Sequence, residues 1–134
     1  MKAILRSLGA VAAGLALAFV LVIGVELLSS VVHPFPIPFD GDIPAHVRRY
    51  PGWVLGGVVF AWGATFVLAT WVASRIGNRM TGAVVGGLLA CALLFNLAML
   101  PYAPWFKVAM LLACPFACWA GLRLGQARVA VDGS

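Results

Sequence analysis

Four polar side chains follow one face of an apolar segment near the N-terminus, and their types are suited to acid–base or ligand chemistry. Glu26 interrupts a long apolar run, and Ser29, Ser30 and His33 follow it at positions i+3, i+4 and i+7. On an α-helix these spacings place the side chains on a shared face. Ionisable groups inside membrane spans usually face the protein interior or a cavity. The stripe therefore predicts a polar site with Glu26 at its base.

Two more polar residues are expected at a similar depth. Asn96 lies about as far from the outer end of its apolar segment as Glu26 does, and Lys107 begins the last segment. We expect a polar pocket that contains Glu26, Ser29, Ser30, His33, Asn96 and Lys107. Two interpretations of Glu26 stay open. It is either a structural anchor, paired with Asn96 or a basic partner, or a titrating proton or ligand site.

A second set of candidate ligands lies in one loop. His33, Asp40, Asp42 and His46 offer the nitrogen and oxygen donors that many metals accept. Their spacing matches no metal motif, and solvation of such a loop is the simpler interpretation. We therefore predict no metal site and no cofactor.

The cysteines are interpreted as packing residues. Cys91, Cys114 and Cys118 all lie within apolar segments, where a thiolate is disfavoured and cysteine behaves as a small hydrophobe. The sequence also contains no Cys-x-x-Cys motif, no phosphate-binding glycine loop and no second intramembrane histidine for a haem. We expect no enzymatic activity.

The elements that position these residues are long apolar segments. Hydrophobic residues make up 63% and charged residues 10% of the 134 residues, with a mean hydropathy of +1.05. A span needs about 20 apolar residues to cross about 30 Å of hydrocarbon. Uncharged runs and prolines divide the chain into helices over about 5–32, 52–75, 80–100 and 105–124. This pattern predicts an all-α fold, an antiparallel four-helix bundle that forms a single transmembrane domain over residues 1–134.

The charges indicate an orientation. The net charge of +5 would suggest nucleic acid in a soluble chain, but here the basic residues flank apolar segments, so we expect no nucleic acid partner. Basic residues predominate on the side of both termini, which the positive-inside rule places in the cytoplasm. Those residues are Lys2, Arg6, Arg75, Arg79, Arg123 and Arg128, against Arg48, Arg49 and Lys107 on the other side.

The loop over residues 33–51 is expected on the outer side. Pro34, Pro36 and Pro38 alternate with apolar residues, which favours an extended strip over the membrane surface or the bundle mouth. A short interfacial helix should follow, with Asp42 or Ile43 as its cap and Pro44 near its first position.

Repeated small residues predict close helix packing. Glycines four residues apart occur at 52 and 56, at 82 and 86, and at 121 and 125. Such faces let helices approach closely. They build the bundle within one chain, or they bind a second copy or another membrane protein. The lipid bilayer is the other expected partner.

Short motifs resemble those of a group of small, uncharacterised bacterial inner-membrane proteins. They are Val32-His33-Pro34-Phe35-Pro36, Asp40-Gly41, Tyr50-Pro51-Gly52-Trp53-Val54-Leu55 and Arg75-Ile76-Gly77-Asn78. The resemblance implies a bacterial origin and four helices, but no activity. Small multidrug-resistance transporters also have an acid in the first of four helices. That acid lies deeper and their loops are shorter, so their role is not carried over to Glu26.

The sequence thus leaves two functions. The leading one is a non-enzymatic accessory or interaction protein of the inner membrane. The alternative is a small transporter or proton-linked permease that uses Glu26 in an outward-facing pocket. Nothing in the sequence indicates a substrate, an oligomeric state or a partner's identity.

Overall fold

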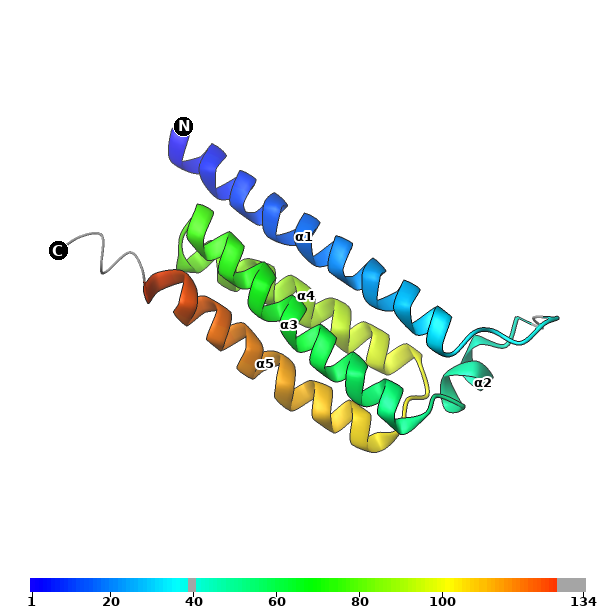
Figure 1. The fold of residues 1–134 in the computed structure, drawn as a ribbon. Coiled ribbons are helices and arrows are strands. Elements are labelled where there is room, and N and C mark those ends of the chain that lie inside the picture. The colour runs from blue at the N-terminus through cyan, green and yellow to red at the C-terminus, as the bar shows by residue number, and fades with distance from the viewer. Residues whose placement is uncertain (39–40, 128–134) are drawn as a thin grey trace.

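Residues 1–38 and 41–127 are described by a computed structural model, and this part of the chain is all-helical (Figure 1). The tail from residue 128 and residues 39–40, which include Asp40, lie outside the described residues. The helices are α1 (Lys2–Val32), α2 (Ile43–Arg48), α3 (Gly52–Ile76), α4 (Arg79–Met99) and α5 (Pro104–Ala127). The long helices begin and end within three residues of the expected boundaries.

The four long helices are all apolar and long enough to cross a membrane. Their outer surfaces carry large hydrophobic side chains: Phe19 is 68% exposed, Phe60 80% and Leu112 70%. Such continuous apolar exposure on every side is typical of a surface that contacts lipid rather than water. The four helices thus support a membrane location.

Helix α3 is central to the bundle. It packs against α1, α4 and α5, whereas α1 and α5 do not contact each other. The long helices run side by side in alternating directions, with α2 and its loops at the end opposite the N-terminus (Figure 1). The core residues on α3 include Phe66, Ala69 and Ala73, each at most 1% exposed. Any side chain on α1 is therefore positioned by how α1 packs on α3 and α4.

Glycine and alanine set the distance between α3 and its neighbours. A Cβ atom added at Gly14 of α1 would lie 3.0 Å from the carbonyl oxygen of Ala69 and 3.1 Å from Val85 of α4. On the opposite side of α3, a Cβ at Gly121 would lie 2.5 Å from the carbonyl oxygen of Val67. Side-chain volume at these positions would push the backbones apart.

Two of the three glycine pairs thus pack within the chain, and one does not. The pairs at 82 and 86 and at 121 and 125 face side chains of α3, including Thr70 and Ser74. Gly56, by contrast, has no atom within 4 Å of a Cβ position, and Gly52 only approaches Trp105 at 3.9 Å. The N-terminal half of α3 therefore keeps a small-residue face that no residue in the described part of the chain fills.

The connections follow the expected capping chemistry. Asp42 caps α2, because its Oδ1 accepts a hydrogen bond of 2.9 Å from the Ala45 amide, and Pro44 lies in the first turn. At the other end, Asn78 and Thr81 form a capping box that starts α4. Thr81 Oγ1 also donates to the Ala73 carbonyl at 2.8 Å, which ties α4 to α3.

The packing at Gly121 gives a direct test. We expect Gly121→Ala to lower the free energy of unfolding by about 1–3 kcal/mol, because the new methyl group meets both the Thr70 hydroxyl group and the Val67 backbone, and the backbone cannot rotate away. Gly87→Ala on α4 is the matched control, since open space surrounds that position. Thermal unfolding in detergent measures both. Equal stability of the two variants would contradict the close packing of α3 and α5.

Candidate functional site

Glu26 lies on the wall of a pocket at the C-terminal end of α1, the end that is expected to face outward and is called the outer end below. The pocket has a volume of ≈ 340 Å³, and Val22, Ile23 and Leu27 form its apolar side. Its polar and aromatic side consists of Glu26, Ser30, His33, Phe35 and Tyr50. The structure therefore brings together three of the expected pocket residues, and it adds two aromatic side chains from the loop and from the start of α3.

Ser29 belongs to a different surface. It is 8% exposed and lines a smaller pocket of ≈ 150 Å³ between α1 and α3, together with Trp53, Val54 and Gly57. Ser30 faces the Glu26 pocket, and its Oγ donates to the Leu27 carbonyl at 2.7 Å. Ser29 therefore packs on α3, whereas Ser30 lies beside Glu26.

An aromatic stack covers this end of the molecule. The His46 ring lies between Phe35, with ring centroids 4.1 Å apart, and His33, at 4.4 Å. Tyr50 is tilted against His33 at 4.6 Å. Asp42 caps α2, and this helix carries His46 to the end of α1, where His46 stacks on His33. Within the proline-rich strip, Phe35 joins the stack, whereas Ile37 is 99% exposed. The position of the strip over the membrane surface or the bundle mouth stays a prediction.

The environment of His46 favours the neutral imidazole. The side chain is only 5% exposed. Its pKa is lowered from the usual value, chiefly because burial penalises the charged form and then because the neighbouring His33 repels a second charge. Nε2 of His46 and Nε2 of His33 are both buried, and neither has a hydrogen-bond partner among the described residues.

Two tyrosines also lie close enough to Glu26 to sense its charge. Burial raises the pKa of Tyr102 to about 12, and the negative charges of Glu26 and Tyr50 add to the shift. The pKa of Tyr50 is raised by burial and then by Glu26. Tyr102 lies in the connection between α4 and α5 and does not line the Glu26 pocket.

The remaining expected residues lie away from this pocket wall. Asn96 on α4 and Lys107 on α5 are half-buried, and neither lines the Glu26 pocket. No lysine, arginine or histidine among the described residues forms an ion pair or hydrogen bond with the Glu26 carboxylate. Within this part of the chain, the acid is without a counter-charge.

The metal candidates do not assemble in the described residues. Asp42 caps α2, His33 and His46 stack face to face, and Asp40 lies outside the described residues. No group of three or more His, Cys, Asp or Glu side chains suited to a metal ion occurs within residues 1–38 and 41–127. Cys114 is buried, Cys118 is half-buried and Cys91 is exposed on the apolar surface, and all are free thiols.

Sequence reasoning missed the contribution of Phe35, Tyr50 and Tyr102 to the site. Tyr50 and Tyr102 lie at the ends of the predicted spans, where interfacial aromatic residues are common, so their residue type alone does not mark a site. The available signal was their position beside prolines at both outer connections, Tyr50-Pro51 and Pro101-Tyr102.

No family model, curated protein or solved structure matches this chain. The chemistry of the site must therefore be taken from its geometry. A carboxylate beside the faces of His33, Phe35 and Tyr50 is suited to a cationic group, because ion pairing and aromatic faces both attract positive charge.

The stack predicts a measurable titration. We expect the His46 side chain to titrate below the usual value of 6.5 in NMR spectra of the protein in micelles. Because the folded state favours neutral His46, its stabilising contribution is present above about pH 6.5 and is lost as the pH falls below it.

Phe35→Ala should move the pKa of His46 back up, because it removes one covering ring. Ile37→Ala is the control in the same loop, since Ile37 is 99% exposed. A His46 pKa at or above 6.5 in the unaltered protein would show that the ring is solvated rather than stacked.

Proposed function

We propose that this chain is a small multi-pass protein of the bacterial inner membrane, with both termini in the cytoplasm. In this proposal it acts as a non-enzymatic accessory protein that binds another membrane protein at its outer end. The partner would contribute a transmembrane helix with a lysine or arginine near its outer end.

The observation that carries this proposal is the isolated Glu26 carboxylate. It lies within a span, in a pocket with aromatic walls, and no cation among the described residues pairs with it. An ionised group in a membrane span is costly and is usually paired. A basic side chain from a partner would supply that pair.

A neighbouring surface supports a helix as the partner. Gly56 and Gly57 on the outer half of α3 have open space where a side chain would lie. Gly57 lines the shallow pocket between α1 and α3, beside Ser29. Small exposed residues allow the backbone of a second helix to approach closely in a membrane. This surface is next to the helix that carries Glu26.

The interior of the helix bundle supports a binding protein rather than a transporter. Between the two ends the core consists of apolar side chains such as Phe66, Val85 and Leu93. The buried hydroxyl groups of Thr65 and Thr70 donate to carbonyls four residues earlier, at 2.9 and 2.6 Å. These polar groups are satisfied within α3, so they offer little to a solute passing through the bundle.

Site-specific photocrosslinking in native membranes tests the proposal. A photoreactive residue at position 27, which lines the pocket, should form a defined protein adduct, whereas one at Leu112 on the opposite lipid-facing surface should not. Glu26→Gln should reduce the adduct at position 27 by about ten- to a hundredfold, because a charged hydrogen bond contributes about 1.5–3 kcal/mol.

Two outcomes would count against this function. An adduct that survives Glu26→Gln unchanged would separate the acid from partner binding. Solute flux into proteoliposomes that is lost in Glu26→Gln, without any protein adduct, would instead favour the permease.

A further inference from the structure

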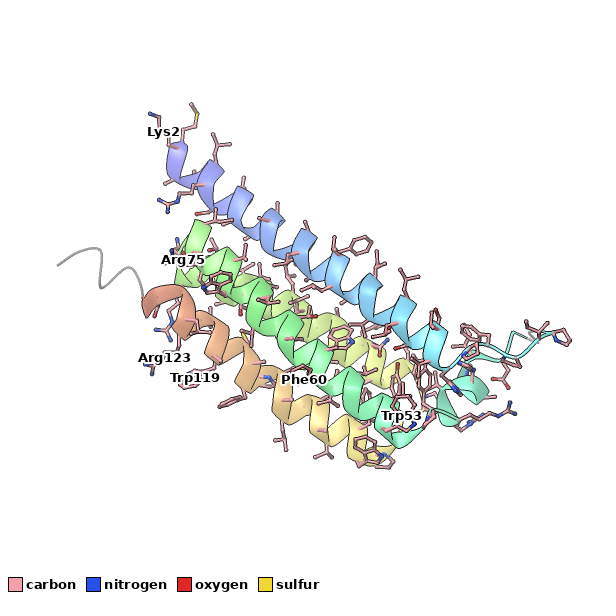
Figure 2. All side chains as sticks on the ribbon, in the orientation of Figure 1. Lys2, Trp53, Phe60, Arg75, Trp119 and Arg123 are labelled. Carbon is pink, nitrogen blue, oxygen red and sulfur yellow. The ribbon has the colours of Figure 1, made fainter. Side chains whose placement is uncertain are left out.

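A second polar pocket lies at the opposite end of the bundle from Glu26. Its volume is ≈ 500 Å³, and all four long helices contribute to its wall. Three arginines converge there from different helices: Arg6 from α1, Arg75 from α3 and Arg79 from α4. Figure 2 shows Lys2, Arg75 and Arg123 at this end, with Trp53 toward the other.

The charge of this pocket is not balanced within the described residues. Glu26 and Asp42, the acids in that part of the chain, lie at or beyond the outer end of α1. Asp132 lies outside the described residues. The positive-inside rule requires only that basic residues lie on this side of the membrane, and it does not specify where their side chains point. Convergence of three arginines on one cavity is a stronger feature, because it creates a local positive potential.

Two helix ends lie at this pocket, and the end of α4 adds to the positive potential. The carbonyl end of α3 would repel an anion, but Arg6 Nε donates to the Ile76 carbonyl at 2.5 Å. The Ala73 carbonyl accepts from both Gly77 N and Thr81 Oγ1. The α3 end is thus largely occupied, while α4 begins at the pocket wall with its N-terminus, the end of a helix that attracts anions.

A buried hydroxyl group also borders the pocket. Ser74 is 7% exposed, and its Oγ has no hydrogen-bond partner among the described residues. Burying a polar group without a partner costs free energy. Ser74 lines the same cavity as the arginines, so an acceptor bound there, or water that accompanies it, would satisfy this donor.

An apolar groove adjoins the arginine pocket. It lies between α1 and α4, has a volume of ≈ 390 Å³ and shares Asn78 with the polar pocket. Ile4, Leu8 and Val11 line it from α1, and Met80 and Val84 line it from α4. A cationic pocket continuous with an apolar groove matches a molecule that has an anionic head and a hydrocarbon chain.

We propose that the inner end of this protein binds an anionic phospholipid. The phosphate group occupies the pocket formed by Arg6, Arg75 and Arg79, and one acyl chain lies along the groove between α1 and α4. Basic pockets between helices on the cytoplasmic side of a membrane recognise such headgroups. The lipid would thus contact both α1 and α4.

Native mass spectrometry of the purified full chain tests this site with defined probes. The protein is titrated with dioleoyl phosphatidylglycerol, with dioleoyl phosphatidylcholine and with inorganic phosphate. We expect phosphatidylglycerol to bind most tightly. Arg75→Gln and Arg79→Gln should each weaken it roughly fivefold, which corresponds to about 1 kcal/mol for each basic residue near a membrane surface.

Arg123→Gln is the matched control. It removes the same charge at the same end of the bundle, but Arg123 lies over the Trp119 ring, 5.2 Å from its centroid, and does not line the pocket. Its phosphatidylglycerol affinity should change less than twofold. A loss equal to that of Arg75→Gln would indicate general electrostatic attraction and would overturn the site.

A second variant separates lipid from free anion. Val84→Trp should fill the groove and weaken phosphatidylglycerol binding, whereas Val108→Trp, on an exposed position of α5, should not. Inorganic phosphate that displaces the lipid at millimolar concentration, with Val84→Trp without effect, would identify a free-anion site and overturn the lipid assignment. Unchanged thermal unfolding of each variant ensures that lost binding reflects the site.

Discussion

The close approach of α3 to its neighbours determines the rest of this structure. Gly14 places the backbone of α1 against Ala69, and Gly121 places α5 against Val67 on the opposite side of α3. In a membrane, where lipid is as apolar as the helix surfaces, such contacts supply much of the association energy. Because α1 is fixed near its middle in this way, its two ends carry Glu26 to the outer pocket and Arg6 to the inner one.

The two ends differ in charge and in construction. The outer end has an acid with no counter-charge among the described residues, and aromatic side chains from the loops line its pocket. The inner end has converging arginines on regular helices, fixed by the Asn78–Thr81 capping box. Between them lies an apolar core with hydroxyl groups bonded to their own helix. The proposed partner and the proposed lipid therefore bind independently, on opposite sides of one bundle.

Helix positions could be predicted from the sequence because charge and proline mark the span boundaries. Rotation about the helix axis could not, since the spans are apolar over most of their surface and the short polar stripe on α1 does not show which side is buried. Ser29 and Ser30 illustrate this. Relative to Glu26 they are turned about 60° to one side and about 40° to the other, so one packs on α3 while the other faces the pocket. Asn96 and Lys107 were predicted to line the Glu26 pocket only because they lie at a similar depth in their apolar segments. The stack of His33, His46 and Phe35 depends on how a loop folds back, which local sequence does not specify.

The central claim is that an apolar bundle crosses the membrane with the Glu26 pocket outside and the arginine pocket inside. Labelling of single cysteines on intact cells by a membrane-impermeant maleimide tests it most directly, in a protein whose Cys91, Cys114 and Cys118 are replaced by alanine. Ser30→Cys and Gln126→Cys report on the two pockets, since both positions are exposed. We expect Ser30→Cys to be labelled on intact cells and Gln126→Cys to be labelled only after the membrane is opened. Labelling of both cysteines on intact cells, or of Gln126→Cys alone, would contradict it.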